Sequence, residues 1–226
     1  MNPPTTDERL PRLSGYQTSL DDPYFLVYRR LFSDLEAAAK KSHGALLDIG
    51  CGNKPYERMF SGRLSSYTGC DVVQSSEGRV DVLCLATAIP LPSQSFDTVL
   101  CTQVIEHVAD HQALLKEAFR LLRPGGVIIL SGPLYWHLHE EPHDYFRFTE
   151  HGFRTLLSHA GFQDLEIIPN GGKWALCGQV LIHSLQKTRL FGRFSVRSIN
   201  RLFAYLDDHN PDRLNPMNYV VTGTRP

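Results

Sequence analysis

The sequence has no long hydrophobic run. No apolar stretch approaches the ~20 residues that a membrane-spanning helix needs, so we expect no such helix. The first residues, Met1 to Asp7, have no basic segment and no apolar core, and we therefore expect no signal peptide. The formal net charge of the 226 residues is -1, so no strong overall field attracts nucleic acid.

Cysteine is scarce and shows no paired spacing. The five cysteines, at 51, 70, 84, 101 and 177, form no CxxC motif, and most of them fall on expected strands. Such a set is typical of reduced core thiols rather than of a disulfide framework. The sequence therefore favours a cytoplasmic protein.

One short stretch organises the rest of the chain. The apolar run from Ala45 to Ile49 predicts a buried parallel strand, and Gly50 and Gly52 follow it. Glycine allows a tight turn and the close approach of a ligand to the backbone. Lys54-Pro55 stands where a dinucleotide-binding fingerprint would continue towards its third glycine, and Asp48 precedes the turn. A carboxylate there repels a pyrophosphate and attracts an ammonium or sulfonium, which favours a cationic adenosine ligand over NAD.

The segment Asp48-Ile49-Gly50-Cys51-Gly52 resembles the first motif of class I S-adenosylmethionine (SAM)-dependent methyltransferases. Further matches follow in the right order over roughly residues 44–170, most specifically from Phe96 to Leu130. The resemblance implies SAM as the cofactor. It also implies an α/β fold, a single-domain Rossmann-like three-layer sandwich. Its mostly parallel seven-stranded sheet would have the last strand antiparallel, with helical additions at the N-terminus and before that strand.

Hydrophobic periodicity and end signals place the individual elements. We expect helices capped by an aspartate at 21–22, by Asp110 and by Thr149, the last of them closed by Gly161. The expected helices span 21–41, 111–122, 150–160, 174–185 and 196–206; the expected strands span 45–49, 66–71, 80–84, 95–101, 127–130, 162–168 and 219–223. The expected organisation is a flexible arm over 1–20 and one domain over 21–226. Within the domain we expect a core over 44–170, a helical insertion over about 173–212 and a last strand over about 217–224.

The resemblance also assigns the cofactor contacts. Asp71 ends the second expected strand about twenty residues after Gly52, where a carboxylate can accept both ribose hydroxyls. Many relatives have an aspartate for the adenine amino group where this chain has Leu85, so the adenine is expected to meet backbone and an apolar wall. The full expected set is Asp48, Gly50, Cys51, Gly52, Asp71, Val72, Leu85, Ala86, Gln103 and His107.

A loop over 132–149 is dense in histidine, carboxylate and aromatic groups. It follows the fifth expected strand, at the sheet edge that usually carries function. Its end, from Asp144 to Thr149, resembles a subgroup of bacterial small-molecule and glycoconjugate methyltransferases. The catalytic candidates are His139, His143 and Asp144, and the substrate-binding candidates are Tyr135, His137 and Arg147.

Methyl transfer to a hydroxyl needs alignment with the sulfonium and a base near neutral pKa, a task that suits histidine. Asp144 either orients a histidine or acts as the base itself. His137, His139, His143 and Asp144 also offer a set of metal ligands. Because such clusters more often form hydrogen-bond networks, no metal is assigned. Arg147 either clamps an anionic or planar acceptor or pairs with Asp144 or Glu150.

The sequence thus favours a SAM-dependent methyltransferase acting on a small-molecule or glycoconjugate acceptor, at oxygen, with no nucleic acid partner. The alternative is a non-catalytic SAM-binding or partner protein that keeps the fold. Basic and aromatic residues between 173 and 203 allow at most a peripheral membrane contact, through 187–203, and they favour a solvated helix face or a subunit interface over it. A homodimer stays open.

Overall fold

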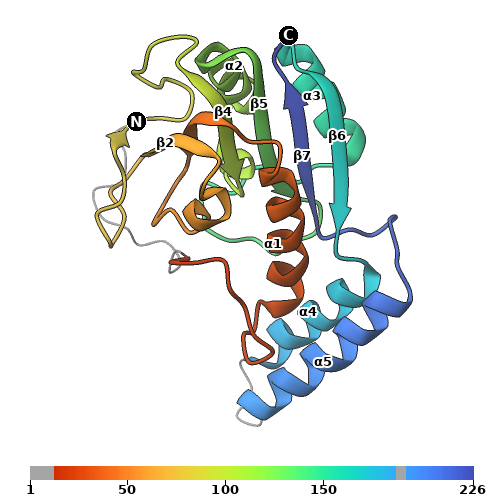
Figure 1. Cartoon of the computed structure of the whole chain (residues 1–226). Helices are drawn as coiled ribbons and strands as arrows, with labels where there is room; N and C mark the ends of the chain where they lie inside the picture. Colours follow the sequence, from red (N-terminus) through yellow and green to blue (C-terminus); the bar gives the residue numbers. More distant parts are fainter. Residues whose placement is uncertain (1–12, 187–191) are drawn as a thin grey trace.

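The computed structural model describes residues 13–186 and 192–226 (Figure 1). Within these residues, seven strands form one sheet in the order β3-β2-β1-β4-β5-β7-β6. β1 to β5 run parallel to one another, and β7 lies antiparallel between β5 and β6. The predicted mixed sheet is therefore confirmed. The strands are β1 (Gly44–Ile49), β2 (Leu64–Asp71), β3 (Val82–Leu83), β4 (Phe96–Thr102), β5 (Leu122–Pro133), β6 (Gln163–Asn170) and β7 (Asn218–Thr224).

Helices cover both faces of the sheet, as the predicted three-layer sandwich requires. One face carries α1 (Phe25–Ala39) and the short 3-10 helix η1 (Glu57–Phe60); the other carries α2 (His111–Leu121) and α3 (Glu150–Ala160). A second 3-10 helix, η2 (Ile105–His107), follows β4. The helices α4 (Lys173–Leu185) and α5 (Arg193–His209) pack on each other beyond the carboxyl ends of the strands (Figure 1). None of the helices in the described ranges combines the length and apolar character needed to cross a membrane.

Strand β1 shows how the sequence builds this core. Leu47 and Ile49 join the hydrophobic cluster under α2 and α3, and Leu46 joins the cluster under α1. Side chains alternate across a strand, so Asp48 lies on the α1 side together with Leu46. A carboxylate is thus buried within an otherwise apolar strand, with 2% of Asp48 exposed.

Two predicted helix starts are confirmed by their caps. The Asp110 carboxylate accepts a hydrogen bond from the Ala113 amide at 2.9 Å, and α2 begins at His111, directly after Asp110. The Thr149 hydroxyl accepts from the Gly152 amide at 3.0 Å. Gly161 ends α3 with a φ of 100°, a left-handed conformation that suits glycine.

Several predicted boundaries were wrong: the strand expected over 127–130 spans Leu122–Pro133, and the helix expected over 196–206 spans Arg193–His209. Two more were wrong for a visible reason. Helix α1 begins at Phe25, because Asp22 accepts from the Tyr24 amide in a preceding turn instead of capping a helix. The expected strand over 80–84 is reduced to Val82–Leu83. The Gln74 side chain bonds both the amide and the carbonyl of Val80, so these backbone groups pair with a side chain rather than with a strand.

The N-terminal segment was predicted to be a flexible arm over 1–20. Residues 1–12 of that prediction lie outside the described residues. Residues 13–20 pack against the body of the domain: the Tyr16 ring meets the Phe32 ring edge-on at 6.3 Å, and the Ser14 hydroxyl bonds Asn53 and Glu77. The described part of the segment therefore lies against the loop that follows β1.

Candidate functional site

The carboxyl ends of β1, β2, β4 and β5 meet at one edge of the sheet because these strands are parallel. Gly50, Asp71, Gln103 and the loop after Pro133 therefore gather there, although they are far apart in sequence. Open α/β sheets bind their ligands at this edge.

The glycine bend after β1 is held by the protein's own contacts. Gly50 and Gly52 have φ angles of 72° and 48°. The amides of Gly50 and Cys51 both donate to the Cys70 carbonyl, at 2.8 and 3.1 Å. A Cβ added to Gly50 would lie 2.3 Å from a methyl carbon of Val104. Glycine at position 50 is thus required by its positive φ and by the packing of Val104, and its contact with a cofactor stays a prediction.

The Asp71 carboxylate faces this bend. Its Oδ2 accepts from the Gly52 amide at 3.1 Å, and its Oδ1 accepts from the Val72 amide at 2.7 Å. Asp71 is 6% exposed. The Val73 amide also lies 3.4 Å from Oδ1, so three backbone amides fix the carboxylate on the bend.

An apolar cavity lies beside Asp71. It has a volume of about 250 Å³ and is lined by Val72, Leu83, Cys84 and Leu85. Leu83 and Leu85 are 59% and 52% exposed. Exposed leucines next to a fixed carboxylate offer an apolar surface for a flat ring, and Leu85 stands where many methyltransferases have an aspartate.

Asp48 lies beneath the bend rather than on its surface. Its Oδ2 accepts a hydrogen bond from the Tyr67 hydroxyl at 2.7 Å. Burial raises the pKa of Asp48 to about 7, against the lowering effect of that hydrogen bond. Asp48 is therefore a carboxyl group under the bend whose charge changes near neutral pH, and the Tyr67 hydroxyl holds it in place.

We expect the raised pKa of Asp48 to make stability depend on pH. The carboxyl holds its proton to about pH 7 in the folded state and only to about pH 4 when unfolded. The folded state thus binds more protons in this window, and the free energy of unfolding falls as pH rises through it. Asp48→Asn removes this pH dependence. The free energy of unfolding of the variant, relative to that of the wild type, should therefore rise by roughly 2–4 kcal/mol between pH 4 and 8.

Urea unfolding of both proteins across this pH range measures the difference. Comparing the two curves cancels the contributions of other groups, such as Glu106, whose pKa burial raises to about 8. Parallel curves for the wild type and Asp48→Asn would contradict the assignment of the raised pKa to Asp48.

Lys54 ties the glycine bend to the segment before β3. Its Nζ lies 2.6 Å from Asp81, whose carboxylate also accepts from the Gly69 amide. The side chain of Lys54 is 7% exposed. In the sequence, Lys54 is only a departure from a glycine fingerprint. In the structure, its apolar stem crosses Gly69, and a Cβ added to Gly69 would lie 2.6 Å from Cε of Lys54.

The loop over 134–148 is organised by Arg147. Its guanidinium donates two hydrogen bonds to Asp144, at 2.6 and 2.8 Å, and the rest to the carbonyls of Trp136, His137 and Phe146. All five N–H donors are used. Of the two alternatives for Arg147, the structure thus supports the pairing with Asp144 and corrects its assignment as a clamp for the acceptor.

His139 is oriented by the same carboxylate. Asp144 Oδ2 accepts from the His139 amide at 3.1 Å and lies 3.2 Å from His139 Nδ1. Hydrogen bonds from Arg147 hold the pKa of Asp144 far below its usual range, and burial lowers the pKa of His139. Asp144 is therefore suited to orienting His139, and its low pKa makes it a poor base.

His107 and Glu106 face His139 from η2. The rings of His107 and His139 meet edge-on at 4.7 Å, and His107 Nδ1 lies 2.9 Å from the His143 carbonyl. Glu106 is fully buried, and burial raises its pKa to about 8, while its own amide and Arg147 act to lower it. The loop is anchored here, because the Glu106 carbonyl accepts from the Tyr145 amide at 2.9 Å.

The remaining predicted residues lie around this corner. His143 is exposed, with Nδ1 3.1 Å from the Tyr145 hydroxyl. His137 is exposed and packs edge-on against His183 of α4 at 4.5 Å. Tyr135 is 40% exposed. Gln103 donates to the Ser131 hydroxyl at 3.1 Å, so it links β4 to β5. Cys51 is buried in the bend, and Ala86, which follows Leu85, is half-buried.

Glu106 and Tyr67 are among the residues of this site that the sequence did not predict, as are Lys54, Tyr24, Trp136 and His183. Glu106 stood within the matched segment, next to His107, and its neighbourhood at the carboxyl edge was the available signal. Tyr67 gave no signal, since its contact with Asp48 depends on the register of β1 against β2.

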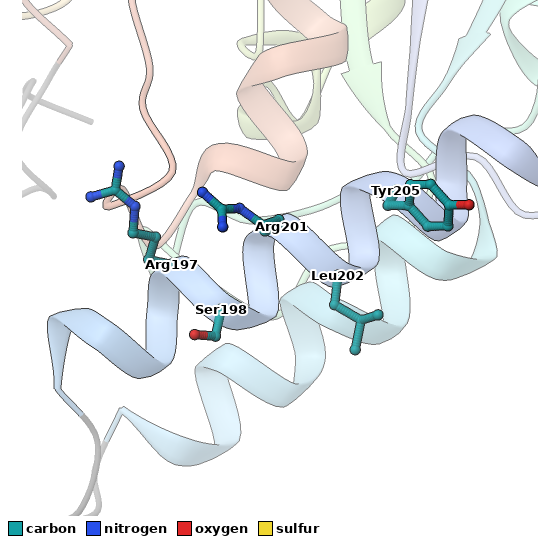
Figure 2. Close-up of a pocket in the computed structure, with 5 residues that line it drawn as sticks. All are labelled: Arg197, Ser198, Arg201, Leu202 and Tyr205. Carbon is teal, nitrogen blue, oxygen red and sulfur yellow. The ribbon is translucent and has the colours of Figure 1, made fainter.

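A second hollow lies on α5, apart from the glycine bend. It has a volume of about 730 Å³, and Figure 2 shows the five side chains that line it. Its lining side chains all come from one helix: Arg197, Ser198, Arg201, Leu202 and Tyr205. Leu202 and Tyr205 are 53% and 59% exposed. Residues 187–191 of the predicted contact surface, which include Lys187 and Arg189, lie outside the described residues.

Comparison with known proteins shows what part of the chain resembles. Residues 47–130 match the family model described as a methyltransferase domain. A curated relative, a ubiquinone biosynthesis O-methyltransferase of Idiomarina loihiensis, is 33% identical over an alignment of 99 residues, and the match covers 38% of this chain and 41% of the relative. The chain therefore spans about two-fifths of that relative's length.

Solved structures share the fold at low identity. A phosphoethanolamine N-methyltransferase 2 of Haemonchus contortus, in complex with SAM, has a TM-score of 0.56 and 17% identity, covering 85% of this chain and 52% of that one. The [4+2]-cyclase SpnF has a TM-score of 0.57 and 19% identity, covering 87% and 81%. One architecture thus carries different reactions in its relatives, and the reaction of this chain has to be argued from its own site.

Proposed function

Residues 47–130 form a class I SAM-dependent methyltransferase domain, and from this we propose that the chain transfers a methyl group from SAM to an acceptor hydroxyl. The acceptor is a small molecule or a glycoconjugate. The reaction forms an O–CH3 bond and breaks the S–CH3 bond of the sulfonium, so a neutral thioether leaves.

One observation carries this proposal: Asp71 is fixed on the glycine bend beside an apolar cavity. Its carboxylate is aimed at the bend by the Gly52 amide, and the cavity lined by Val72 and Leu85 adjoins it. A ribose bound to Asp71 brings its adenine to the cavity and its sulfonium towards the bend above Asp48. Once it is ionised, the Asp48 carboxylate favours that cation, and the cation in turn acts to lower the raised pKa of Asp48.

His139 serves the acceptor side. Its Nδ1 is taken by Asp144, which leaves Nε2 for the reaction. His139 lies at the carboxyl edge, between η2 and the loop over 134–148. We assign it the activation of the acceptor hydroxyl, the step that methyl transfer to oxygen needs beyond alignment.

The acceptor would lie against an aromatic wall. Tyr24, Trp136 and His183 pack together, with ring centroids 5.2 to 6.1 Å apart, and they come from three separate segments. His137 joins them at 4.8 Å from Trp136. Such a surface suits a planar or apolar acceptor better than an anionic one, since the Arg147 donors are already used.

We expect Asp71→Asn to weaken SAM binding by roughly 10- to 150-fold, the loss of hydrogen bonds to a charged acceptor. Isothermal titration calorimetry with SAM and with its demethylated product measures this. Asp164→Asn is the matched control, because Asp164 starts β6 at the opposite edge of the sheet and should not change the affinity. If the wild type bound neither compound, the proposal would fail.

A second candidate is a protein that binds SAM without transferring its methyl group. The absence of an adenine aspartate at Leu85 favours it, and the cyclase among the structural neighbours is an example of another reaction on this fold. Release of the demethylated product in the presence of hydroxyl-bearing acceptors separates the two. SAM binding with no release across phenolic, aliphatic and sugar hydroxyls would favour the second candidate.

The proposal extends to partners and location. The free thiols of Cys51, Cys70 and Cys101 fit a reducing compartment such as the cytoplasm. Arg197 and Arg201 beside the exposed Leu202 support at most a peripheral contact with an anionic surface. No nucleic acid partner is proposed.

A further inference from the structure

Three side chains with metal-binding groups converge at the carboxyl edge of the sheet. Glu106 and His107 come from η2, and His139 comes from the loop over 134–148. One potential ligand atom of each lies within 4.8 Å of the other two. Glu106 Oε1 and His107 Nε2 are 4.0 Å apart. Two imidazoles and one carboxylate are the donor set of many catalytic metal centres.

Glu106 is the strongest sign that this corner takes a ligand. Its side chain is completely buried. Among residues 13–186 and 192–226, no group forms a hydrogen bond of good geometry with either carboxylate oxygen. Buried polar atoms are rarely left in this state. The Arg147 guanidinium cannot satisfy it, because its donors go to Asp144 and to three carbonyls.

Both histidines are prepared to offer Nε2. Nδ1 of His107 is 2.9 Å from the His143 carbonyl, and Nδ1 of His139 is 3.2 Å from both the His137 carbonyl and Asp144. Carbonyl and carboxylate oxygens only accept hydrogen bonds, so Nδ1 of each ring carries the proton. The lone pair then lies on Nε2. Metal-binding histidines in proteins are oriented in this way by a carboxylate or carbonyl behind the ring.

We propose that Glu106 and the Nε2 atoms of His107 and His139 bind one divalent transition-metal cation of the zinc type. Zinc–ligand bonds of about 2.0–2.1 Å need the ligand atoms to be roughly 3–3.5 Å apart. The present separations, 4.0 Å for Glu106 and His107 and at most 4.8 Å within the set, exceed this distance by about 1 Å. Binding of the cation therefore requires the side chains to rotate towards one another. Imidazole ligands select zinc-type cations over Mg²⁺ and Ca²⁺.

The role of this cation rests on the proposed function. Three protein ligands leave a coordination position for the acceptor hydroxyl. The cation lowers the pKa of a bound hydroxyl, so its O–H bond breaks and the proton passes to solvent. The resulting oxygen anion forms the new bond to the methyl group as the S–CH3 bond breaks. His139 thus acts on the acceptor through the metal.

The test uses the full chain after treatment with a chelator. Titration calorimetry with Zn²⁺ is expected to give one site, with Mg²⁺ binding far more weakly, and Co²⁺ is expected to give visible absorption bands typical of histidine ligation. Glu106→Gln and His139→Asn are expected to weaken Zn²⁺ binding at least about 100-fold. His143→Asn is the neighbouring control and should retain the wild-type affinity, because only the backbone carbonyl of His143 takes part.

Other results would overturn the proposal. These are no stoichiometric Zn²⁺ binding, equal binding of Mg²⁺, Glu106→Gln binding as tightly as the wild type, or His143→Asn as damaging as His139→Asn. Circular dichroism of each variant shows that it is folded, and the two independent ligand variants guard against the failure of one. Because SAM is absent from the titration, failure of SAM binding would refute the proposed function and leave the metal site standing.

Discussion

His139→Asn is expected to lower kcat for methyl transfer by about 10²–10⁴-fold, the usual contribution of a group that assists removal of a proton. Asparagine keeps a polar side chain of similar length at Nδ1, but it cannot supply the Nε2 lone pair on which activation of the acceptor depends. Asp144 and Arg147 hold the loop together through their own hydrogen bonds, so the variant should fold.

The measurement is release of the demethylated cofactor, with a hydroxyl-bearing acceptor found by screening the wild type. Affinity for SAM should stay the same, because His139 lies on the acceptor side and Asp71 on the cofactor side. His159→Asn, at an exposed position near the end of α3, is the matched control. A His139→Asn variant with unchanged kcat would remove this residue from the chemistry.

Gly50→Val is expected to destabilise the domain by roughly 4–6 kcal/mol, which combines backbone strain with overpacking. A valine is strongly disfavoured at a φ of 72°, and its Cβ would lie 2.3 Å from a Val104 methyl carbon. Because domains are stable by only about 5–15 kcal/mol, much of the protein should unfold at physiological temperature.

Gly62→Val separates the two causes. Gly62 has a similar φ of 77°, but within the described ranges no atom lies within 4 Å of an added Cβ. This variant should therefore show only the cost of the backbone conformation. Urea unfolding of both variants gives the comparison. Equal losses of stability would show that the contact with Val104 is unimportant.

Local patterns in the sequence predicted the strand, the glycine bend and the carboxylate of the proposed cofactor site. The strand before Gly50 and the carboxylate at Asp71 are linked to their roles by short-range signals: an apolar run, a glycine turn and a fixed spacing. The caps of α2 and α3 are equally local, and both were predicted.

The acceptor half depended on contacts between distant segments. The sequence could not decide between Asp144 and Glu150 as the partner of Arg147, because both lie three residues away. The choice follows from the fold of the loop, which also brings the Trp136 and His137 carbonyls to the same guanidinium. Burial of Glu106 was equally hidden, since a charged residue next to a histidine gives no local sign of lying in the core.

The loop over 134–148 does not stand on its own. The amides of Leu134 and Tyr135 both donate to the carbonyl of Met217, at 2.9 and 3.1 Å, immediately before β7. The segment before the last strand therefore supports the loop that carries the proposed acceptor site, although some 80 positions separate the two. An exchange of acceptor preference between homologues by grafting would accordingly have to move two separate pieces of chain together, and a chimera that carries only the histidine-rich piece would inherit a mismatched support.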